Sequence, residues 1–252
     1  WAWRDSNKAH IWGSERTTVE FINPVSNYLQ ALTLRSFADW QVTGKENVPP
    51  WGPLIVVVNH QSNFDPTLVS TSLPRRVSFL AKKGLFKSAI PAWFLRSYGA
   101  YPLDRENVDI GAYRWALRQL DAGQMIVIFP EGTRTRGGMR KAQPGVARLA
   151  LSTGVSLLPV GMTGTERLGT IFRVFNPTGK IRVNIGPPFT VPNIDGRPGP
   201  EVLESMTDMI MQRVAALMPP EYRGVYQVTG KPGPDMSVAT RQDVESPGVP
   251  LA

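Results

Sequence analysis

The most constraining feature of the sequence is an apolar run of five residues, Leu54–Val58, in which four side chains are β-branched. Successive side chains of a strand point to opposite faces, so a run without polar alternation is typical of a strand buried on both faces. A connector with three prolines, residues 48–53, leads into this run. Such a strand needs helices on both sides of its sheet, and the run therefore indicates a parallel α/β architecture.

Strand and helix patterns alternate along the rest of the chain. Four further apolar runs are strand candidates, at residues 77–81, 125–129, 156–160 and 180–185. Amphipathic helical patterns lie between or after them, at residues 109–121, 144–152 and 201–217. We therefore predict an α/β fold with a mostly parallel central sheet flanked by helices.

The N-terminal part of this fold is predicted to be an amphipathic helical segment. Between Glu20 and Trp40, apolar residues recur at helical spacing, at Phe21, Val25, Tyr28, Leu29 and Leu32. Such a helix either packs on the core or lies on a membrane surface. We divide the chain into a membrane-proximal helical segment at 1–47, an α/β domain at 48–224, and a tail at 225–252. The tail is rich in Gly, Pro, Ser and charged residues and is predicted to be disordered.

The residue types that are missing or rare limit the chemistry. The chain has no cysteine, which excludes disulfides, a thiolate nucleophile and cysteine-ligated zinc. Its two histidines are His10 and His60, and His10 lies in a polar N-terminal stretch outside the periodic segments. An imidazole base would therefore have to be His60, and a multi-histidine metal site cannot be built.

Positive charge is concentrated in the middle third of the chain. Residues 75–148 hold 14 Lys and Arg against 5 Asp and Glu, whereas the whole chain holds 28 and 20. No acidic residue occurs between Pro66 and Leu103. A stretch of this kind indicates an anionic partner, such as a phosphate group, a nucleic acid or an anionic lipid, or else a solvated basic face.

His60 and Asp65 follow the buried strand directly. The end of a strand in an α/β sheet is where ligands usually bind. Across a turn of this length, the Asp65 carboxylate could accept a hydrogen bond from one imidazole nitrogen and leave the other free to take a proton. The pair is thus a candidate for general base catalysis, with Ser62 as a less favoured nucleophile.

Three other segments combine glycines, arginines and strand ends. Residues 129–138 place glycines and arginines after an apolar strand, which suits the close approach of a phosphate. Residues 99–105 end in Arg105, and residues 158–165 contain glycines after a further strand. Taken singly, each segment is also compatible with an ordinary turn.

The four segments in this order resemble the glycerolipid acyltransferase family, the lysophosphatidic acid acyltransferase-like enzymes of phospholipid synthesis. The family's NH-x4-D block matches residues 59–65, its G-x5-R block residues 99–105, its FPEGTR block residues 129–134, and its proline-centred block residues 158–161. The matches span about two fifths of the chain.

The resemblance implies roles at the matching positions. His60 is expected to be the general base and Asp65 its orienting partner. Ligands for the acceptor are expected at Lys82, Lys83, Arg105, Glu131, Gly132, Thr133 and Arg134. Of these, Arg105, Arg134 and one of the two lysines would meet a phosphate. Glu131 would either hold a hydroxyl of the acceptor or shape its loop.

The implied reaction moves a fatty acyl group from acyl-CoA or acyl carrier protein to the sn-2 hydroxyl of 1-acylglycerol 3-phosphate, giving phosphatidic acid. The thioester is already activated, so no cofactor and no metal are expected. Insoluble substrates imply peripheral or monotopic attachment to the cytoplasmic face of a membrane. Aromatic, aliphatic and basic residues mix at 86–96, which suits either an anionic interface or a buried helix.

Other functions remain as alternatives at this point. The acceptor could instead be glycerol 3-phosphate or another lysolipid. A non-catalytic phospholipid-binding module would not need His60 and Asp65 together. Nucleic acid is not predicted as a partner, because apolar strands and helices interrupt the basic region and no recognition signature is present. A metal hydrolase using His60, Asp65 and Glu131 would need further ligands.

Overall fold

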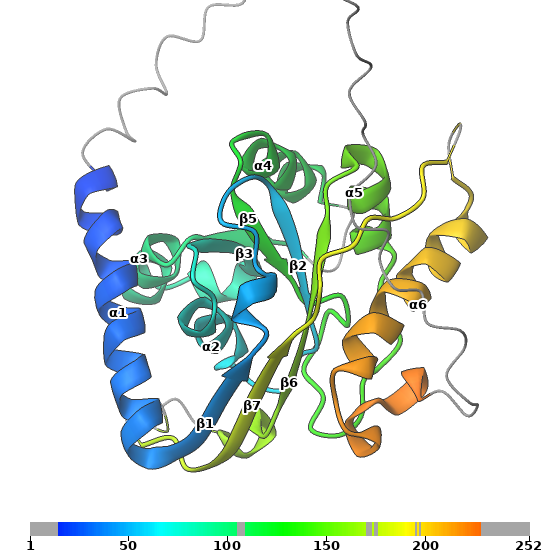
Figure 1. Cartoon of the computed structure of the whole chain (residues 1–252). Helices are drawn as coiled ribbons and strands as arrows, with labels where there is room; N and C mark the ends of the chain where they lie inside the picture. The colour runs from blue at the N-terminus through cyan, green and yellow to red at the C-terminus, as the bar shows by residue number, and fades with distance from the viewer. Residues whose placement is uncertain are drawn as a thin grey trace, which may run out of the picture.

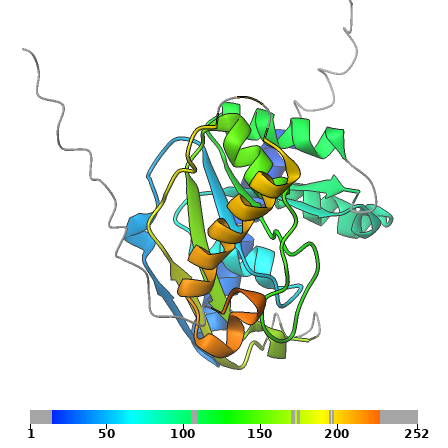
Figure 2. The same ribbon diagram turned by 90° about the vertical axis from the view of Figure 1, so that its right-hand side faces the viewer.

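The computed structural model describes residues 15–104, 109–169, 173, 176–194, 196 and 198–227. Within this part, one sheet has the strand order β1-β7-β6-β2-β5-β3-β4 (Figures 1 and 2). Its strands are β1 Ala38–Thr43, β2 Leu54–Val58, β3 Val77–Lys82, β4 Ala100–Leu103, β5 Met125–Ile128, β6 Leu157–Thr163 and β7 Gly179–Ile185. Neighbouring strands are parallel except for β6 and β7. The predicted mostly parallel sheet is therefore confirmed.

Helices cover both faces of the sheet, as Figures 1 and 2 show. One face carries α1 Glu15–Phe37, α2 Asp65–Ser72 and α3 Ala89–Ser97. The other carries α4 Ile110–Asp121, α5 Gly145–Thr153 and α6 Pro200–Ala216. The result is a three-layer α/β/α arrangement.

The central strand β2 explains why both layers are needed. Leu54, Val56 and Val58 belong to the core on the α1–α3 side. Ile55 and Val57 belong to the core on the α4–α6 side. All five side chains are at most 1% exposed, so the apolar run read from the sequence is buried on both faces. Burial of each such side chain contributes about 1.5–3 kcal/mol.

Two predicted boundaries differ from the structure. The first helix, predicted for residues 20–40, ends at Phe37, and Trp40 lies in the edge strand β1, whose residues alternate between half-buried and exposed. The predicted disordered tail includes Tyr226, which is buried. The Tyr226 hydroxyl accepts a hydrogen bond from the backbone N–H of Ala142, and this tie fixes the start of the tail. Residues 228–252 lie outside the described part.

Helix α1 contacts the protein through several polar side chains and the buried Leu34, and many of its apolar side chains point outward. Asn27 and Gln30 form hydrogen bonds with the side chains of Ser70 and Thr67 on α2, at 3.1 and 3.0 Å. The exposed apolar side chains of this helix are Val25, Tyr28, Leu29, Leu32 and Phe37. Among the helices of the described residues, none combines the length and apolarity needed to span a bilayer.

The parallel strands bring several loops to one edge of the sheet. Strands β2, β3, β4, β5 and β6 point in the same direction, so the segments that follow them meet at their carboxyl ends. Strand β2 lies between β5 and β6. The loop after β2, which contains His60, is therefore flanked by the loops after β5 and β6.

Candidate active site

The central contact of the site joins His60 and Asp65. The imidazole Nδ1 lies 2.8 Å from Oδ2 of Asp65, and both residues are buried. An ionised carboxylate only accepts hydrogen bonds, so Nδ1 carries the proton in this contact. The other ring nitrogen, Nε2, is then an acceptor, and among the described residues it has no hydrogen-bond partner.

The position of Asp65 is fixed by the turn that precedes it. The backbone N–H groups of Gln61 and Ser62 donate to Asp65 Oδ2 at 2.6 and 2.7 Å. Asp65 is also the first residue of α2, where the helix dipole favours a negative charge. Its Oδ1 atom is buried and has no partner among the described residues. The carboxylate is thus oriented entirely through Oδ2.

His60 is held from two further sides. Its ring stacks at a tilt on Phe129, with centroids 4.5 Å apart. Its neighbour Asn59 pairs with the backbone of Met162 on β6, donating to the carbonyl at 2.9 Å and accepting from the N–H at 2.8 Å. The first residue of the NH-x4-D pattern therefore ties the His60 loop to the sheet.

The Glu131 carboxylate connects the His60 loop to the loop after β5. Its Oε1 accepts the backbone N–H of His60 at 2.9 Å. Its Oε2 accepts the backbone N–H of Arg140 at 2.8 Å and the Thr135 hydroxyl at 3.1 Å. In return, the backbone N–H of Thr135 donates to the His60 carbonyl at 2.9 Å. Both carboxylate oxygens are engaged within the protein, which supports the loop-shaping role of the two considered for Glu131.

Burial dominates the electrostatics of Glu131. The residue is 5% exposed, and desolvation raises the pKa of its carboxyl above the ordinary 4.5. The hydrogen bonds from Arg140, His60 and Thr135 act in the opposite direction but do not offset the burial. The network around His60 therefore contains a carboxylate that is costly to ionise.

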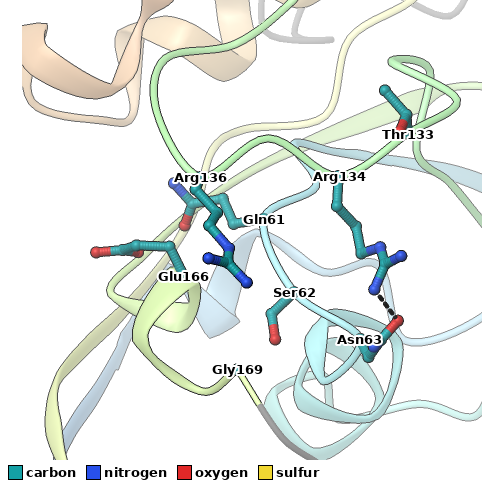
Figure 3. Close-up of a pocket in the computed structure, with 8 residues that line it drawn as sticks. All are labelled: Gln61, Ser62, Asn63, Thr133, Arg134, Arg136, Glu166 and Gly169. Atoms are coloured by element: carbon teal, nitrogen blue, oxygen red, sulfur yellow. Dashed lines mark hydrogen bonds between the residues drawn. The ribbon is translucent and has the colours of Figure 1, made fainter.

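A pocket of about 230 Å³ lies beside the His60 loop (Figure 3). Three loops form it, those after β2, β5 and β6, and all of its lining residues but one are polar or charged: Gln61, Ser62, Asn63, Thr133, Arg134, Arg136, Glu166 and Gly169. His60 itself does not line the pocket, but the next three residues do. The pocket is thus suited to a polar group of a ligand, and it lies next to His60.

Two arginines carry the positive charge of this pocket. Arg134 donates to the Asn63 side-chain oxygen at 2.6 Å, which fixes its direction. In Figure 3, the Arg136 guanidinium extends toward Ser62, whereas the Glu166 carboxylate points away from the middle of the pocket. Both arginines are exposed, so their fork-shaped donors remain accessible to an anion.

The other predicted ligands differ in where the structure places them, and of those described only Thr133 lines the pocket. Lys82 ends β3, and Lys83 begins the short turn η2 Lys83–Phe86; both are exposed. Gly132 is in the loop after β5 with a positive φ of 66°, and Thr133 lines the pocket. Arg105 lies outside the described residues. The roles predicted for all of these residues stay predictions.

Several pocket residues were not singled out by the sequence. Asn63 lies inside the NH-x4-D pattern as an unspecified position, and Glu166 and Gly169 follow the fourth block. Arg136 had a visible signal, because it repeats the Thr-Arg pair of the FPEGTR block. Glu166 had none, because its place in the pocket depends on the pairing of β6 with β2.

The site can remove a proton from a hydroxyl and hold an anion nearby. His60 offers a free acceptor nitrogen, Asp65 stabilises the charge that this nitrogen would gain, and the arginines offer donors for phosphate. Within the described part of the chain, no group of three or more His, Cys, Asp and Glu side chains is placed to hold a metal ion.

Comparison with known proteins gives consistent matches. The acyltransferase family model matches residues 39–163. The 1-acyl-sn-glycerol-3-phosphate acyltransferase of Bacillus subtilis is 30% identical over 185 residues, covering 70% of this chain and 87% of that protein. The enzyme of the same name from Streptococcus pneumoniae is 27% identical, covering 73% and 69%. The crystal structure of the 1-acyl-sn-glycerophosphate acyltransferase PlsC of Thermotoga maritima matches with a TM-score of 0.61 and 27% identity, covering 78% and 79%.

Proposed function

Since this chain belongs to the acyltransferase family and is an O-acyltransferase, we propose that its acceptor is 1-acylglycerol 3-phosphate. The acyl group would move to the sn-2 hydroxyl, and the product would be phosphatidic acid. The observation that carries this proposal is the contact of His60 with Asp65 beside a pocket that contains Arg134 and Arg136. One half of the site suits a hydroxyl and the other half suits a phosphate.

The chemical step is a direct transfer. The acceptor hydroxyl gives its proton to His60 Nε2 while its oxygen bonds to the carbonyl carbon of the thioester. The resulting tetrahedral intermediate collapses, the carbon–sulfur bond breaks, and the proton on His60 passes to the departing thiolate. Asp65 stabilises the imidazolium between these two events. Base catalysis of this kind contributes about 10²–10⁴-fold to the rate.

The phosphate of the acceptor would lie against the arginine side of the pocket. Arg134 has its guanidinium oriented by Asn63, so it loses less freedom when an anion binds. A charge-assisted hydrogen bond from an arginine is about twice as strong as one between neutral groups. Lys82 and Lys83, at the end of β3 and directly after it, remain further candidates, as does Arg105 from the G-x5-R block of the sequence.

The thioester donor would be acyl-CoA or acyl carrier protein. Both carry a phosphopantetheine arm and negative charge, and the basic middle third of the chain suits either. We assign no cofactor beyond this co-substrate, because a thioester already has a good leaving group.

The enzyme would work at the cytoplasmic face of a membrane, attached peripherally or monotopically. The outward apolar side chains of α1 support this proposal. The polar side chains Asn27 and Gln30 on the same helix point inward and form hydrogen bonds to α2. Helix α3 adds Trp93 and Phe94, which are 54% and 40% exposed. Aromatic and aliphatic side chains beside basic ones suit an interface with anionic lipid.

The test is a panel of acceptors with palmitoyl-CoA as donor and release of free CoA thiol as the readout. We expect 1-acylglycerol 3-phosphate to give the fastest release, and Arg134→Gln to raise the KM for this acceptor about 10-fold or more. Arg148→Gln is the matched control, since Arg148 is exposed on α5 and does not line the pocket. Faster release with glycerol 3-phosphate or another lysolipid would reassign the acceptor, and acyl carrier protein as donor extends the panel.

A further inference from the structure

A short C-terminal segment contacts two of the loops that contribute to the pocket, those after β5 and β6. We name residues 218–226 the C-terminal clasp; it contains the turns η5 Pro220–Tyr222 and η6 Gly224–Tyr226. We name residues 131–143, which contain Arg134 and Arg136, the arginine loop. The backbone N–H of Met139 in this loop donates to the Tyr222 carbonyl at 3.1 Å, and the backbone N–H of Val225 donates to the Met139 carbonyl at 3.1 Å.

Tyr222 also reaches a residue that lines the pocket. Its hydroxyl donates to Glu166 Oε1 at 3.1 Å, and Glu166 lines the pocket from the loop after β6. Burial raises the pKa of the Tyr222 hydroxyl, and the Glu166 carboxylate acts in the same direction. The hydroxyl therefore keeps its proton at neutral pH and remains a donor. Tyr222 thus links the arginine loop, through the backbone of Met139, to Glu166, through its own side chain.

Further contacts fix the clasp, both to the arginine loop and within the clasp itself. The Tyr226 hydroxyl accepts the backbone N–H of Ala142, and Arg223 Nε donates to the Met218 carbonyl at 2.8 Å. The clasp and the loop also approach closely at Gly224, where a Cβ atom would lie 2.1 Å from the Met139 carbonyl oxygen. No side chain can be inserted here without separating the two segments.

Glu166 depends on this link for its own position. Its Oε2 atom is buried and has no hydrogen-bond partner among the described residues. Its Oε1 atom has the Tyr222 hydroxyl at 3.1 Å and Arg167 Nε at 3.6 Å, and the Arg167 side chain is 72% exposed. Because an exposed ion pair contributes little, the tyrosine hydroxyl is the main contact that orients this carboxylate.

We propose that Tyr222 is a positioning residue that sets the distance between the arginine loop and Glu166. This distance would determine how well the phosphate-bearing acceptor fits the pocket. The proposal rests on the proposed function, because it takes the pocket as the place where the acceptor phosphate binds. It assigns a role to the C-terminal clasp, which lies outside the four sequence blocks. Tyr222 acts through Arg134 and Arg136 and takes no part in proton transfer.

The proposal predicts a separation of kinetic constants. In Tyr222→Phe, the KM for the lysophospholipid acceptor should rise about 3- to 10-fold, the range expected for one lost hydrogen bond. The kcat and the KM for palmitoyl-CoA should stay within about twofold, because His60 and Asp65 do not contact the clasp. Glu166→Ala removes the acceptor of the same hydrogen bond and also a charge, so it is read in a double-mutant cycle: its effect on the acceptor KM should differ between the wild type and Tyr222→Phe by the same factor of about 3- to 10-fold.

Hydrogen exchange of the ligand-free protein gives a second readout that needs no substrate. The amide of Met139 in the arginine loop and the amide of Leu168 beyond Glu166 are both hydrogen-bonded, and both should exchange faster in Tyr222→Phe. Tyr113→Phe is the matched control, because the Tyr113 hydroxyl contacts Ser152 at 2.7 Å away from the pocket. It should leave both amides unchanged.

The two readouts separate failure of this inference from failure of the proposed function. If Arg134→Gln raises the KM for the acceptor but Tyr222→Phe changes neither that constant nor the exchange, the positioning role is wrong and the phosphate site stands. If Arg134→Gln leaves the acceptor KM unchanged, the phosphate site is wrong. In that event, unchanged exchange in Tyr222→Phe would also overturn the spacing role, whereas faster exchange would keep it for a different ligand.

Discussion

At the scale of single residues, the chemistry depends on how Asp65 is held. Three donors converge on its Oδ2 atom, while Oδ1 has no partner among the described residues. An asparagine could therefore place its oxygen at Oδ2 and its nitrogen at Oδ1 and keep the orientation of His60. What it would lose is the negative charge that stabilises the imidazolium.

We accordingly expect Asp65→Asn to fold and to lower kcat by about 10²-fold or more, with smaller changes in KM. Steady-state thiol release at saturating donor and acceptor measures this. Asp121→Asn serves as the control, since Asp121 is exposed at the end of α4. A kcat within about threefold of the wild type would show that the charge of Asp65 is not needed.

Glu131 gives a prediction about pH. Its pKa is raised in the folded protein by burial, so folding favours the protonated carboxyl. The stability that this group contributes is therefore fully present below pH 4.5 and is lost as the pH rises through the raised pKa. Glu131→Gln cannot titrate at this position.

The free energy of unfolding of the wild type, relative to that of Glu131→Gln, should consequently decrease between pH 4 and pH 7. Urea unfolding at several pH values measures this difference, and the titration of other groups cancels in it. A difference that stays constant or grows with pH would mean that the hydrogen bonds to the carboxylate outweigh its desolvation.

The residues of the site differ in how far the sequence could predict them. His60 and Asp65 were predictable because both follow a buried strand and histidine is scarce. The internal role of Glu131 was not decided by sequence, because its partners include backbone N–H groups of His60 and Arg140, and backbone donors leave no trace in the residue pattern. Tyr222 lies far along the chain from Met139 and Glu166 and meets them only in the fold.

At the scale of elements, α1 carries the clearest expectation. Its outer side chains Leu29 and Leu32 are 54% and 52% exposed, and transfer of the exposed half of each into lipid is favourable by about 1 kcal/mol. Replacing both with serine should weaken binding to vesicles that contain phosphatidylglycerol at least about 10-fold, measured by co-sedimentation. The fold should be retained, because neither side chain is buried.

A matched control for this prediction is available on the opposite layer. Ile110 on α4 and Val202 on α6 are 58% and 38% exposed. Serine at both positions removes a similar apolar surface and should leave vesicle binding unchanged. Equal weakening in the two double variants would mean that binding does not occur through α1.

The junction of β6 and β7 gives a prediction about stability. Gly164 follows β6 with a φ of 88°, and a Cβ atom there would lie 1.9 Å from the Lys180 carbonyl oxygen. Gly154, which ends α5, also has a positive φ, 63°, but nothing lies within 4 Å of its Cβ position. Gly154→Ala should cost about 1–2 kcal/mol from backbone strain alone.

We expect Gly164→Ala to cost at least about 1 kcal/mol more, because the start of β7 must move away from β6. Thermal or urea unfolding of the two variants measures the difference. Equal costs would contradict the close approach of the two strands.

At the scale of the whole molecule, the layered α/β fold was predictable because its central strand is apolar on both faces and helices alternate with the inner strands. The edge strands β1 and β4 were not predicted. Strand β1 alternates half-buried and exposed residues directly after a helix, and β4 has only four residues. The antiparallel direction of β7 could not be read either, since it depends on how the chain returns to the sheet.

The division of the chain at residue 47 stays a prediction, although β1 within the first segment pairs with β7. The same pairing sets the place of α1, because the helix runs directly into β1. The apolar outer side of α1 is thus anchored to the same sheet that carries His60, so attachment to a membrane and catalysis would belong to one rigid unit.

The most direct test of the central claim is the release of CoA thiol from palmitoyl-CoA by the wild type and by His60→Ala, with and without 1-acylglycerol 3-phosphate. We predict release that depends on the acceptor in the wild type and a loss of about 10²–10⁴-fold in the variant, with cooperative thermal unfolding showing that the variant is folded. Acceptor-dependent release that persists in His60→Ala would contradict the assignment of His60 as the base that activates the hydroxyl.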